Sequence, residues 1–277
     1  MVAAGLVFIA AAFCIWVYAA SEAHLRSFAP PPAFRLTLNA SPAVIARGAH
    51  IAVTRGCTDC HRDRLQGGLF HDEGWSGRSV APNLPALARA ASPAALEWAI
   101  RHGIGHDGRA LYDMPSYNFV HLSDEDLSAL ILFLEAAPVV EESLPSAWMG
   151  PLRRWQLATG ADAAMPAFLD QVPPLRLQGA ADRRLAHGEY LAMTSCNECH
   201  GFDLHAHSPF PGSAPDLAIV GAYEHDDFVR LMRTARPVGG RALNPMMAGA
   251  VRKRFVHWTD AEVDDLYLFL HALAPSE

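Results

Sequence analysis

The sequence predicts an all-α protein in which two small, similar helical domains follow one membrane-spanning helix. Three observations favour this fold class: an uncharged apolar run at the N-terminus, a set of motifs that occurs twice, and a length of 277 residues. At roughly 150 residues per domain, that length indicates about two domains. We place the membrane segment at residues 1–22, the first domain at 40–137, a linker at 138–180 and the second domain at 181–275.

The first of these elements is the apolar N-terminal run. Nineteen uncharged residues extend from Val2 to Ala20, and as a helix they span about 28 Å, close to the roughly 30 Å of a bilayer's hydrocarbon core. A cleaved secretory signal is the competing interpretation, because Ala19, Ala20 and Ser21 are small enough for a cleavage site. The run exceeds the roughly 7–15 apolar residues of such a signal, and no positive residue precedes it. We therefore expect a retained anchor.

Composition excludes two other classes of protein. Hydrophobic residues make up 51% of the chain and charged residues 18%, against roughly 25% charged residues in an average soluble domain, so a disordered chain is excluded. The 22 Lys and Arg residues are outnumbered by 29 Asp and Glu, which gives a net charge of −7 without a basic block. We therefore expect no nucleic-acid partner.

Each predicted domain contains the pattern C-x-x-C-H. The first copy is Cys57, Cys60 and His61, and the second is Cys196, Cys199 and His200. Two thiols on one helical turn can add to the two vinyl groups of a haem, and the adjoining imidazole then faces the iron. A zinc site needs four nitrogen or sulfur ligands, which two separated triplets do not supply compactly. The pattern predicts two covalently attached haem c groups.

The surroundings of the two motifs repeat as well. A helix-like segment precedes each motif, and a glycine in it, Gly48 or Gly188, lets another helix approach closely. The later matches are Ala81-Pro82-Asn83-Leu84 with Ala214-Pro215-Asp216-Leu217, and Phe119-Val120-His121 with Phe255-Val256-His257. Because the segments around the motifs repeat together with the motifs, the sequence predicts two similar domains.

Each copy closes with an amphipathic helix. Capping boxes are predicted at Ser123 with Asp126 and at Thr259 with Glu262. The apolar stripes behind them follow helical spacing: Leu127, Leu130, Ile131 and Leu134, and then Val263, Leu266, Tyr267 and Leu270. No segment shows strand-like alternation of comparable quality. So few helical residues make a thin core, which a large apolar cofactor would complete.

With Cys57-Thr58-Asp59-Cys60-His61, Met114-Pro115 and the helix that opens at Leu122-Ser123-Asp124 in view, the first copy resembles class I cytochrome c, and the second copy resembles the same domain. The whole chain is similar to membrane-anchored dihaem c-type cytochromes, which pass electrons between a dehydrogenase or quinol-oxidising complex and an oxidase. The resemblance implies two tandem cytochrome c-like domains.

The resemblance also assigns roles to individual residues. It implies that the four paired cysteines are thioether anchors and that His61 and His200 are the proximal iron ligands. Met114 resembles the distal ligand of the first haem, where a soft thioether favours ferrous iron. Pro82 and Pro215 match the proline whose carbonyl accepts the proximal imidazole N–H and fixes its tautomer.

The second copy leaves its distal ligand open between two methionines. An ungapped match places Met246 opposite Met114, but four extra residues precede Phe255, so Met247 is equally within reach. Related sequences that resemble Met247-Ala248-Gly249-Ala250-Val251 usually ligate through that methionine. We choose Met247, with Met246 as the alternative.

The linker between the two copies is rich in proline and has no clear period. Its aromatic residues, Trp148, Trp155 and Phe168, favour a segment that packs against one or both domains over a flexible tether. We expect this packing to hold the haems in a fixed relation.

The functional hypothesis is one-electron transfer, from a dehydrogenase or quinol-oxidising donor to a terminal oxidase or soluble cytochrome, by a respiratory-chain carrier or complex subunit rather than an enzyme. Haem attachment takes place outside the bacterial cytoplasmic membrane, so we expect a single-pass protein with both domains in the periplasm. An enzymatic alternative, such as a peroxidase or a small-substrate oxidising centre, would leave an open position at the second haem.

Overall fold

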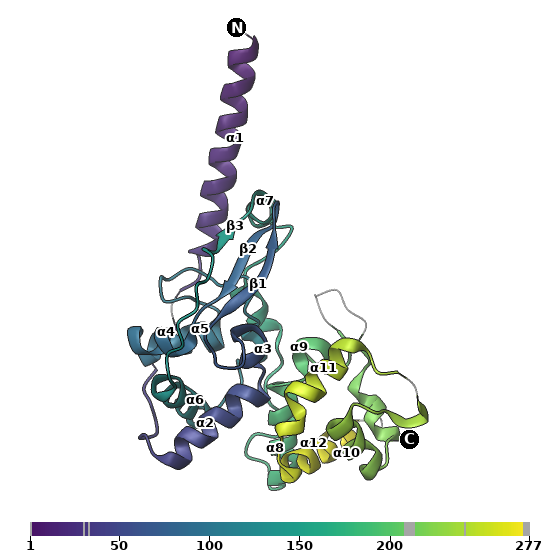
Figure 1. Cartoon of the computed structure of the whole chain (residues 1–277). Coiled ribbons are helices and arrows are strands. Elements are labelled where there is room, and N and C mark those ends of the chain that lie inside the picture. The colour runs from purple at the N-terminus through teal and green to yellow at the C-terminus, as the bar shows by residue number, and fades with distance from the viewer. Residues whose placement is uncertain (1, 30, 33, 208–213, 241, 274–277) are drawn as a thin grey trace.

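The computed structural model describes residues 2–29, 31–32, 34–207, 214–240 and 242–273. Residue 1 of the predicted membrane segment and residues 208–213, 241 and 274–275 of the predicted second domain lie outside them. The chain is mostly helical, as predicted (Figure 1). In order, its elements are α1 Val2–Leu25, α2 Pro42–Thr54, α3 Cys57–His61, β1 Gly68–Glu73, β2 Gly77–Ala81, α4 Leu84–Ala90, α5 Pro93–His102, α6 Asp124–Ala136, β3 Trp148–Met149, α7 Pro151–Thr159, α8 Arg183–Met193, α9 Asn197–His200, α10 His225–Thr234, α11 Pro245–Lys253 and α12 Asp260–Ala272. Short 3-10 turns lie at Ser116–Asn118, Met165–Gln171, Leu217–Ala222, Val238–Gly240 and Phe255–His257.

The first helical unit, α2 to α6, is built on a close crossing of its first and last helices. Ser41 caps α2 and Pro42 occupies its first turn, and both residue types favour the start of a helix at these positions. A Cβ atom on Gly48 would lie 2.1 Å from the carbonyl oxygen of Ala129 on α6. The two backbones therefore touch at this glycine, and the apolar stripe of α6 becomes the centre of the core, with Leu127 and Ile131 fully buried.

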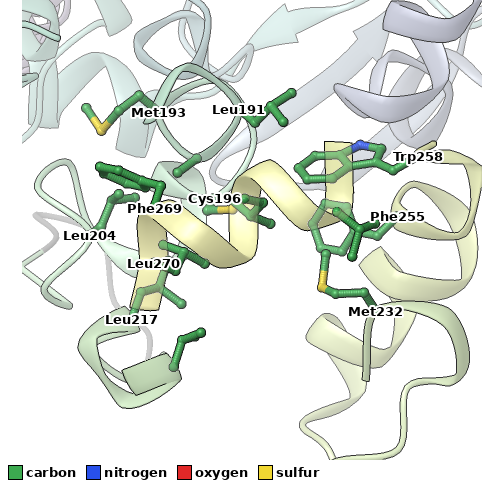
Figure 2. Close-up of a cluster of buried hydrophobic side chains, with 14 of the residues drawn as sticks. Leu191, Met193, Cys196, Leu204, Leu217, Met232, Phe255, Trp258, Phe269 and Leu270 are labelled. Carbon is green, nitrogen blue, oxygen red and sulfur yellow. The ribbon is translucent and has the colours of Figure 1, made fainter. Parts of the chain in front are cut away.

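The second helical unit, α8 to α12, repeats this crossing. A Cβ atom on Gly188 would lie 2.0 Å from the carbonyl oxygen of Asp265 on α12. Buried side chains surround α12, with Phe255 and Met232 toward one end of the helix and Phe269 and Leu204 toward the other (Figure 2). The expected role of both glycines is thus confirmed.

The two predicted capping boxes have different outcomes. At α12 the box is complete, because Thr259 and Glu262 each bond the backbone of the other. At α6 only half of it forms: the Ser123 hydroxyl accepts the Asp126 N–H, while the Asp126 carboxylate bonds Arg47 and Tyr190 instead. The tertiary partners outcompete the local one for this carboxylate.

A small antiparallel sheet in the first unit was not anticipated from the sequence. Strand β1 pairs with β2, with an irregularity between Leu69 and His71, and β2 pairs with β3 from the linker. Apolar and polar residues do not alternate along β1, because this strand is largely exposed, so the pattern that reveals a half-buried strand is missing. The sheet is an addition to a helical fold.

The linker packs against α1 as well as against the first unit. Trp155 on α7 makes ring contacts with Phe13 and Trp16 on α1, at centroid distances of 5.5 and 6.2 Å. Leu25 and Leu157 are buried together in a small cluster where these helices meet the first unit. Trp155 therefore meets the N-terminal helix, whereas we expected it to pack against a domain.

The two helical units contact each other through equivalent positions. His50 on α2 bonds Glu262 at the start of α12 at 2.8 Å, and Tyr190 on α8 bonds Asp126 at the start of α6. Burial would raise the pKa of Glu262, but the hydrogen bonds from His50 and Thr259 lower it to about 2. Because the pKa of Glu262 lies below its ordinary range, the stability that this carboxylate contributes is present at neutral pH and is lost as the pH falls from about 4.5 toward 2.

We predict that Gly48→Ala destabilises the first unit, because the new methyl group would meet a helix backbone that cannot move aside. The expected cost is about 1 to 3 kcal/mol in the free energy of unfolding, measured by denaturation of the haem-loaded protein. Gly249→Ala on α11 is the matched control. Nothing lies within 4 Å of its added Cβ, so it should gain about 0.5 to 1 kcal/mol. Equal stability of the two variants would contradict the close crossing.

Candidate haem-binding sites

Each C-x-x-C-H motif forms a short helix directly after the first long helix of its unit. Gly56, which precedes Cys57, has a left-handed backbone with φ of 80°. This conformation favours glycine and turns the chain sharply from α2 into α3. All four motif cysteines are free thiols, so neither pair forms a disulfide. The thiols of each motif are therefore available for another bond.

The two motif histidines have the same hydrogen-bond partner. Nδ1 of His61 lies 2.8 Å from the carbonyl oxygen of Pro82, and Nδ1 of His200 lies 2.8 Å from that of Pro215. A carbonyl oxygen only accepts, so Nδ1 carries the proton and Nε2 has a free lone pair. The structure brings each predicted histidine together with its predicted proline, and the resulting tautomer suits a metal ligand.

Burial controls the protonation of both motifs. It lowers the pKa of His61 and of His200, a shift that the bond to the proline carbonyl partly opposes. Burial also raises the pKa of the Cys57 thiol to about 11 and that of Cys196 to about 12. At neutral pH the imidazoles are therefore neutral and the thiols protonated. Figure 2 shows Cys196 within the apolar cluster that causes this shift.

Met114 lies in the loop between α5 and α6 and packs against the core of the first unit. Hydrogen bonds hold the loop around Pro115, which follows Met114. The Ser116 N–H bonds the carbonyl of Met114 at 2.8 Å, and the Ser116 hydroxyl bonds the carbonyl of Ala99 at 2.8 Å. Its thioether is thus held at the edge of the core by a rigid segment.

Met246 and Met247 lie on α11, where the structure separates them clearly. Met246 is 75% exposed, whereas Met247 packs against the core of the second unit. Asn244 caps this helix and Pro245 begins it, so consecutive side chains point about 100° apart. Only the second of the two methionines faces the interior.

Arg254 joins the two motifs, and sequence reasoning did not single it out. Its Nε bonds Asp59 inside the first motif at 2.6 Å, and its Nη1 bonds Glu198 inside the second motif at 3.0 Å. Burial would lower the pKa of Arg254, but the two carboxylates more than offset this, so it remains a cation. The sequence did hold one signal for this role. The match of Phe119 with Phe255 places the charged Arg254 opposite the uncharged Asn118.

Several buried polar atoms of the two domains have no hydrogen-bond partner among the described residues. They include both amide atoms of Asn118 and the indole N–H groups of Trp98 and Trp258. Native proteins rarely bury such groups unsatisfied, so each needs a partner that the chain does not supply. A haem with two carboxylate side groups fits this need, as it fits the paired thiols and the neutral imidazoles.

The remaining histidines near the motifs are occupied or exposed. His102 bonds Glu97 at 2.8 Å, His205 bonds Asp216 at 3.0 Å and His121 bonds the Pro173 carbonyl at 2.8 Å. His106 and His257 are exposed. Within the described part of the chain, no three His, Cys, Asp or Glu side chains gather as a metal site.

Comparison with known families matches both units. The model of the cbb3-type cytochrome c oxidase subunit III family matches residues 43–134, and the cytochrome c model matches residues 185–274. Domains of this kind bind haem c covalently through C-x-x-C-H.

Similar curated proteins are cytochrome subunits of dehydrogenases. The cytochrome c subunit of the quinone alcohol dehydrogenase from Gluconobacter oxydans is 29% identical over 264 residues, which is 82% of this chain and 54% of the relative. The cytochrome subunit of fructose dehydrogenase from Gluconobacter japonicus is 24% identical, over 83% of this chain and 52% of the relative. The gluconate 2-dehydrogenase cytochrome c subunit from Pantoea cypripedii is 28% identical, over 83% and 51% respectively.

The chain spans about half the length of these relatives. Both of its helical units nevertheless match cytochrome c models, and both carry the motif, the histidine and the proline carbonyl in the same arrangement. The protein belongs to the c-type cytochromes, with two cytochrome c domains in tandem.

Proposed function

We propose that the chain binds two haem c groups, one in each domain, and relays single electrons as the membrane-anchored cytochrome subunit of a dehydrogenase complex. The observation that carries this proposal is Arg254, which holds the two haem-attachment motifs against each other across the domain contact. Two electron carriers that act independently would not need their motifs to be joined. An electron relay needs this connection, because electron transfer between two haems requires the haems to stay close.

In the first domain, Cys57 and Cys60 would form the thioether bonds. His61 would bind the iron through Nε2, oriented by its bond to Pro82. The Met114 thioether, held by the loop between α5 and α6, would be the second protein ligand of the iron. When bound, haem c supplies the one-electron chemistry of ferric and ferrous iron.

In the second domain, Cys196 and Cys199 would form the thioether bonds, and His200 with its bond to Pro215 would provide the proximal ligand. Met247 is the distal ligand that we propose, because it packs against the core while Met246 faces solvent. A histidine and a methionine in each domain would then both be available to bind the iron. This favours an electron carrier over an enzyme with an open iron.

We also propose that α1 is retained and spans the bacterial cytoplasmic membrane once, with both domains in the periplasm. α1 is the one helix among the described residues that is long and apolar enough to cross a bilayer. Beyond the apolar run, Glu22 pairs with Arg109 of the first domain at 2.8 Å and Arg154 of α7 at 3.0 Å. Removal of α1 up to Ala20 would strip Trp155 of its aromatic partners.

The partners that we propose follow from the relatives, which are subunits of alcohol, fructose and gluconate dehydrogenases. The donor is a dehydrogenase subunit. The acceptor is the quinone pool, a terminal oxidase or a soluble cytochrome. The net charge of −7 would guide basic partners electrostatically.

We predict that the denatured protein, made in a host able to attach haem, is heavier than its polypeptide by two haem groups. A variant with Cys196→Ser and Cys199→Ser should carry one haem, because it lacks both thioether bonds of the second site. Cys14→Ser, in α1, is the control and should carry two. Mass spectrometry gives the count directly. Wild-type protein with fewer than two haems would contradict the proposal.

We predict that Met247→Ala removes the sulfur-to-iron absorption of one haem and lowers its reduction potential. The expected fall is on the order of 0.1 V, well inside the roughly 0.8 V range that axial ligands cover. Met246→Ala, one residue away and exposed, should leave both the spectrum and the potential as in wild type. An optical redox titration checks both variants. A reversed result would assign the ligand to Met246.

We predict that Arg254→Gln weakens the domain contact and lowers both reduction potentials, because two partly buried carboxylates within the motifs lose their cation. The expected cost in the free energy of unfolding is about 1.5 to 3 kcal/mol, the usual worth of hydrogen bonds to charged groups. Redox titration and denaturation of the haem-loaded protein measure the two effects.

Arg252→Gln, near the end of α11, is the matched control, since Arg252 is exposed. Adding Asp59→Asn and Glu198→Gln to Arg254→Gln should raise both potentials at least to the wild-type values, because the three side chains carry a net charge of −1 in wild type, −2 in Arg254→Gln and 0 in the triple variant. If Arg254→Gln alone titrates and unfolds like wild type, Arg254 does not couple the motifs.

A further inference from the structure

Three large apolar side chains are exposed beside α1. Trp75 in the β1–β2 turn is 76% exposed, and Leu152 and Trp155 on α7 are 44% and 42% exposed. The three form one patch, because the Leu152 N–H bonds the Trp75 carbonyl at 3.0 Å and residues 152 and 155 share a helix face. We call these three residues the aromatic patch. Exposed apolar groups of this size, gathered together, indicate a contact surface.

The level of the aromatic patch along α1 indicates the surroundings that the patch meets. Trp155 contacts Phe13 and Trp16, both within the uncharged run. The first charged residue of α1 is Glu22, which pairs with Arg154 on the same short helix as the patch. At 1.5 Å per residue, Phe13 and Trp16 lie about 9 to 13 Å from Glu22 along the helix axis. The patch is therefore level with the final apolar turns of α1.

Figure 1 shows the same arrangement, with α7 beside the lower part of α1, the tip of the β1–β2 hairpin next to α7, and the rest of both domains beyond the end of α1. If α1 spans a bilayer, its last apolar turns lie at the boundary between acyl chains and headgroups. Tryptophan is enriched at that level, because its ring is apolar and its N–H is polar. The aromatic patch therefore suits a lipid surface in its residue types and in its level along α1.

We infer that the aromatic patch enters the headgroup region of the bilayer that α1 spans and forms a second membrane contact of this chain. The inference rests on the proposed retention of α1. One spanning helix alone leaves a domain free to tilt about its exit point. A second contact on α7 and the hairpin fixes the orientation of the first domain toward the bilayer.

The experiment uses the full-length, haem-loaded protein in nanodiscs of phosphatidylethanolamine and phosphatidylglycerol. The photoreactive residue p-benzoylphenylalanine replaces Trp75 or Leu152 in separate variants. It replaces Phe8 in a third variant, which reports on α1, and Ile219 in the control, since Ile219 is an equally exposed apolar residue of the second domain. After illumination, mass spectrometry detects a gain of one phospholipid mass.

We expect lipid adducts at positions 8, 75 and 152 and none at 219. An adduct at position 8 with none at 75 and 152 would overturn the inference while leaving the anchor intact. Cross-links from 75 and 152 to a second copy of the chain, in place of lipid, would also overturn it. The absence of an adduct at position 8 would refute the proposed anchor and, with it, the second contact.

Discussion

The close crossing of the first and last helices in each domain determines where the haem-binding groups lie. Gly48 and Gly188 remove the side chain that would otherwise keep α2 from α6 and α8 from α12. The first helix of each pair leads directly into the C-x-x-C-H motif, so its position against the last helix sets the position of the thiols and the imidazole. The start of each last helix carries Asp126 or Glu262, which the other domain contacts. The absence of a side chain at these two glycines therefore affects both the position of the motif within each domain and the contact between the domains.

The contact between the domains is reciprocal, as expected when one repeat packs against its copy. His50 reaches Glu262 while Tyr190, its counterpart, reaches Asp126. The reciprocity ends at Arg254, whose counterpart in the first domain is an uncharged residue. A single guanidinium bonds the carboxylates of both motifs. This one cation offsets one of the two negative charges, so the three side chains together keep a net charge of −1.

Local patterns in the sequence were sufficient for the apolar N-terminal helix, the first and last helices of each domain, the glycine crossings and the paired motifs, because each is encoded within one turn or one stripe of residues. Other features had no local signature, among them α7 in the proline-rich linker and α11. Strand β1 is largely exposed, so it lacks alternation. The bond between Arg254 and Asp59 joins residues 195 positions apart. Spacing left both Met246 and Met247 within reach of the same loop position. The proposal of Met247 is supported by helix α11, which turns adjacent side chains apart and leaves Met246 exposed.

The linker extends the same fixed geometry from α1 to the second domain. Its helix α7 packs on α1 and its strand β3 joins the sheet of the first domain. The carbonyl of Pro173 then accepts a bond from His121 of the first domain, and the N–H groups of Arg176 and Leu177 bond Glu189 of the second. Because α1 also bonds the first domain directly, through Leu25 and Ala110, that domain lies between α1 and the second. The second domain is thus the more distant from α1, and its surface is the freer of the two to meet a partner in solution.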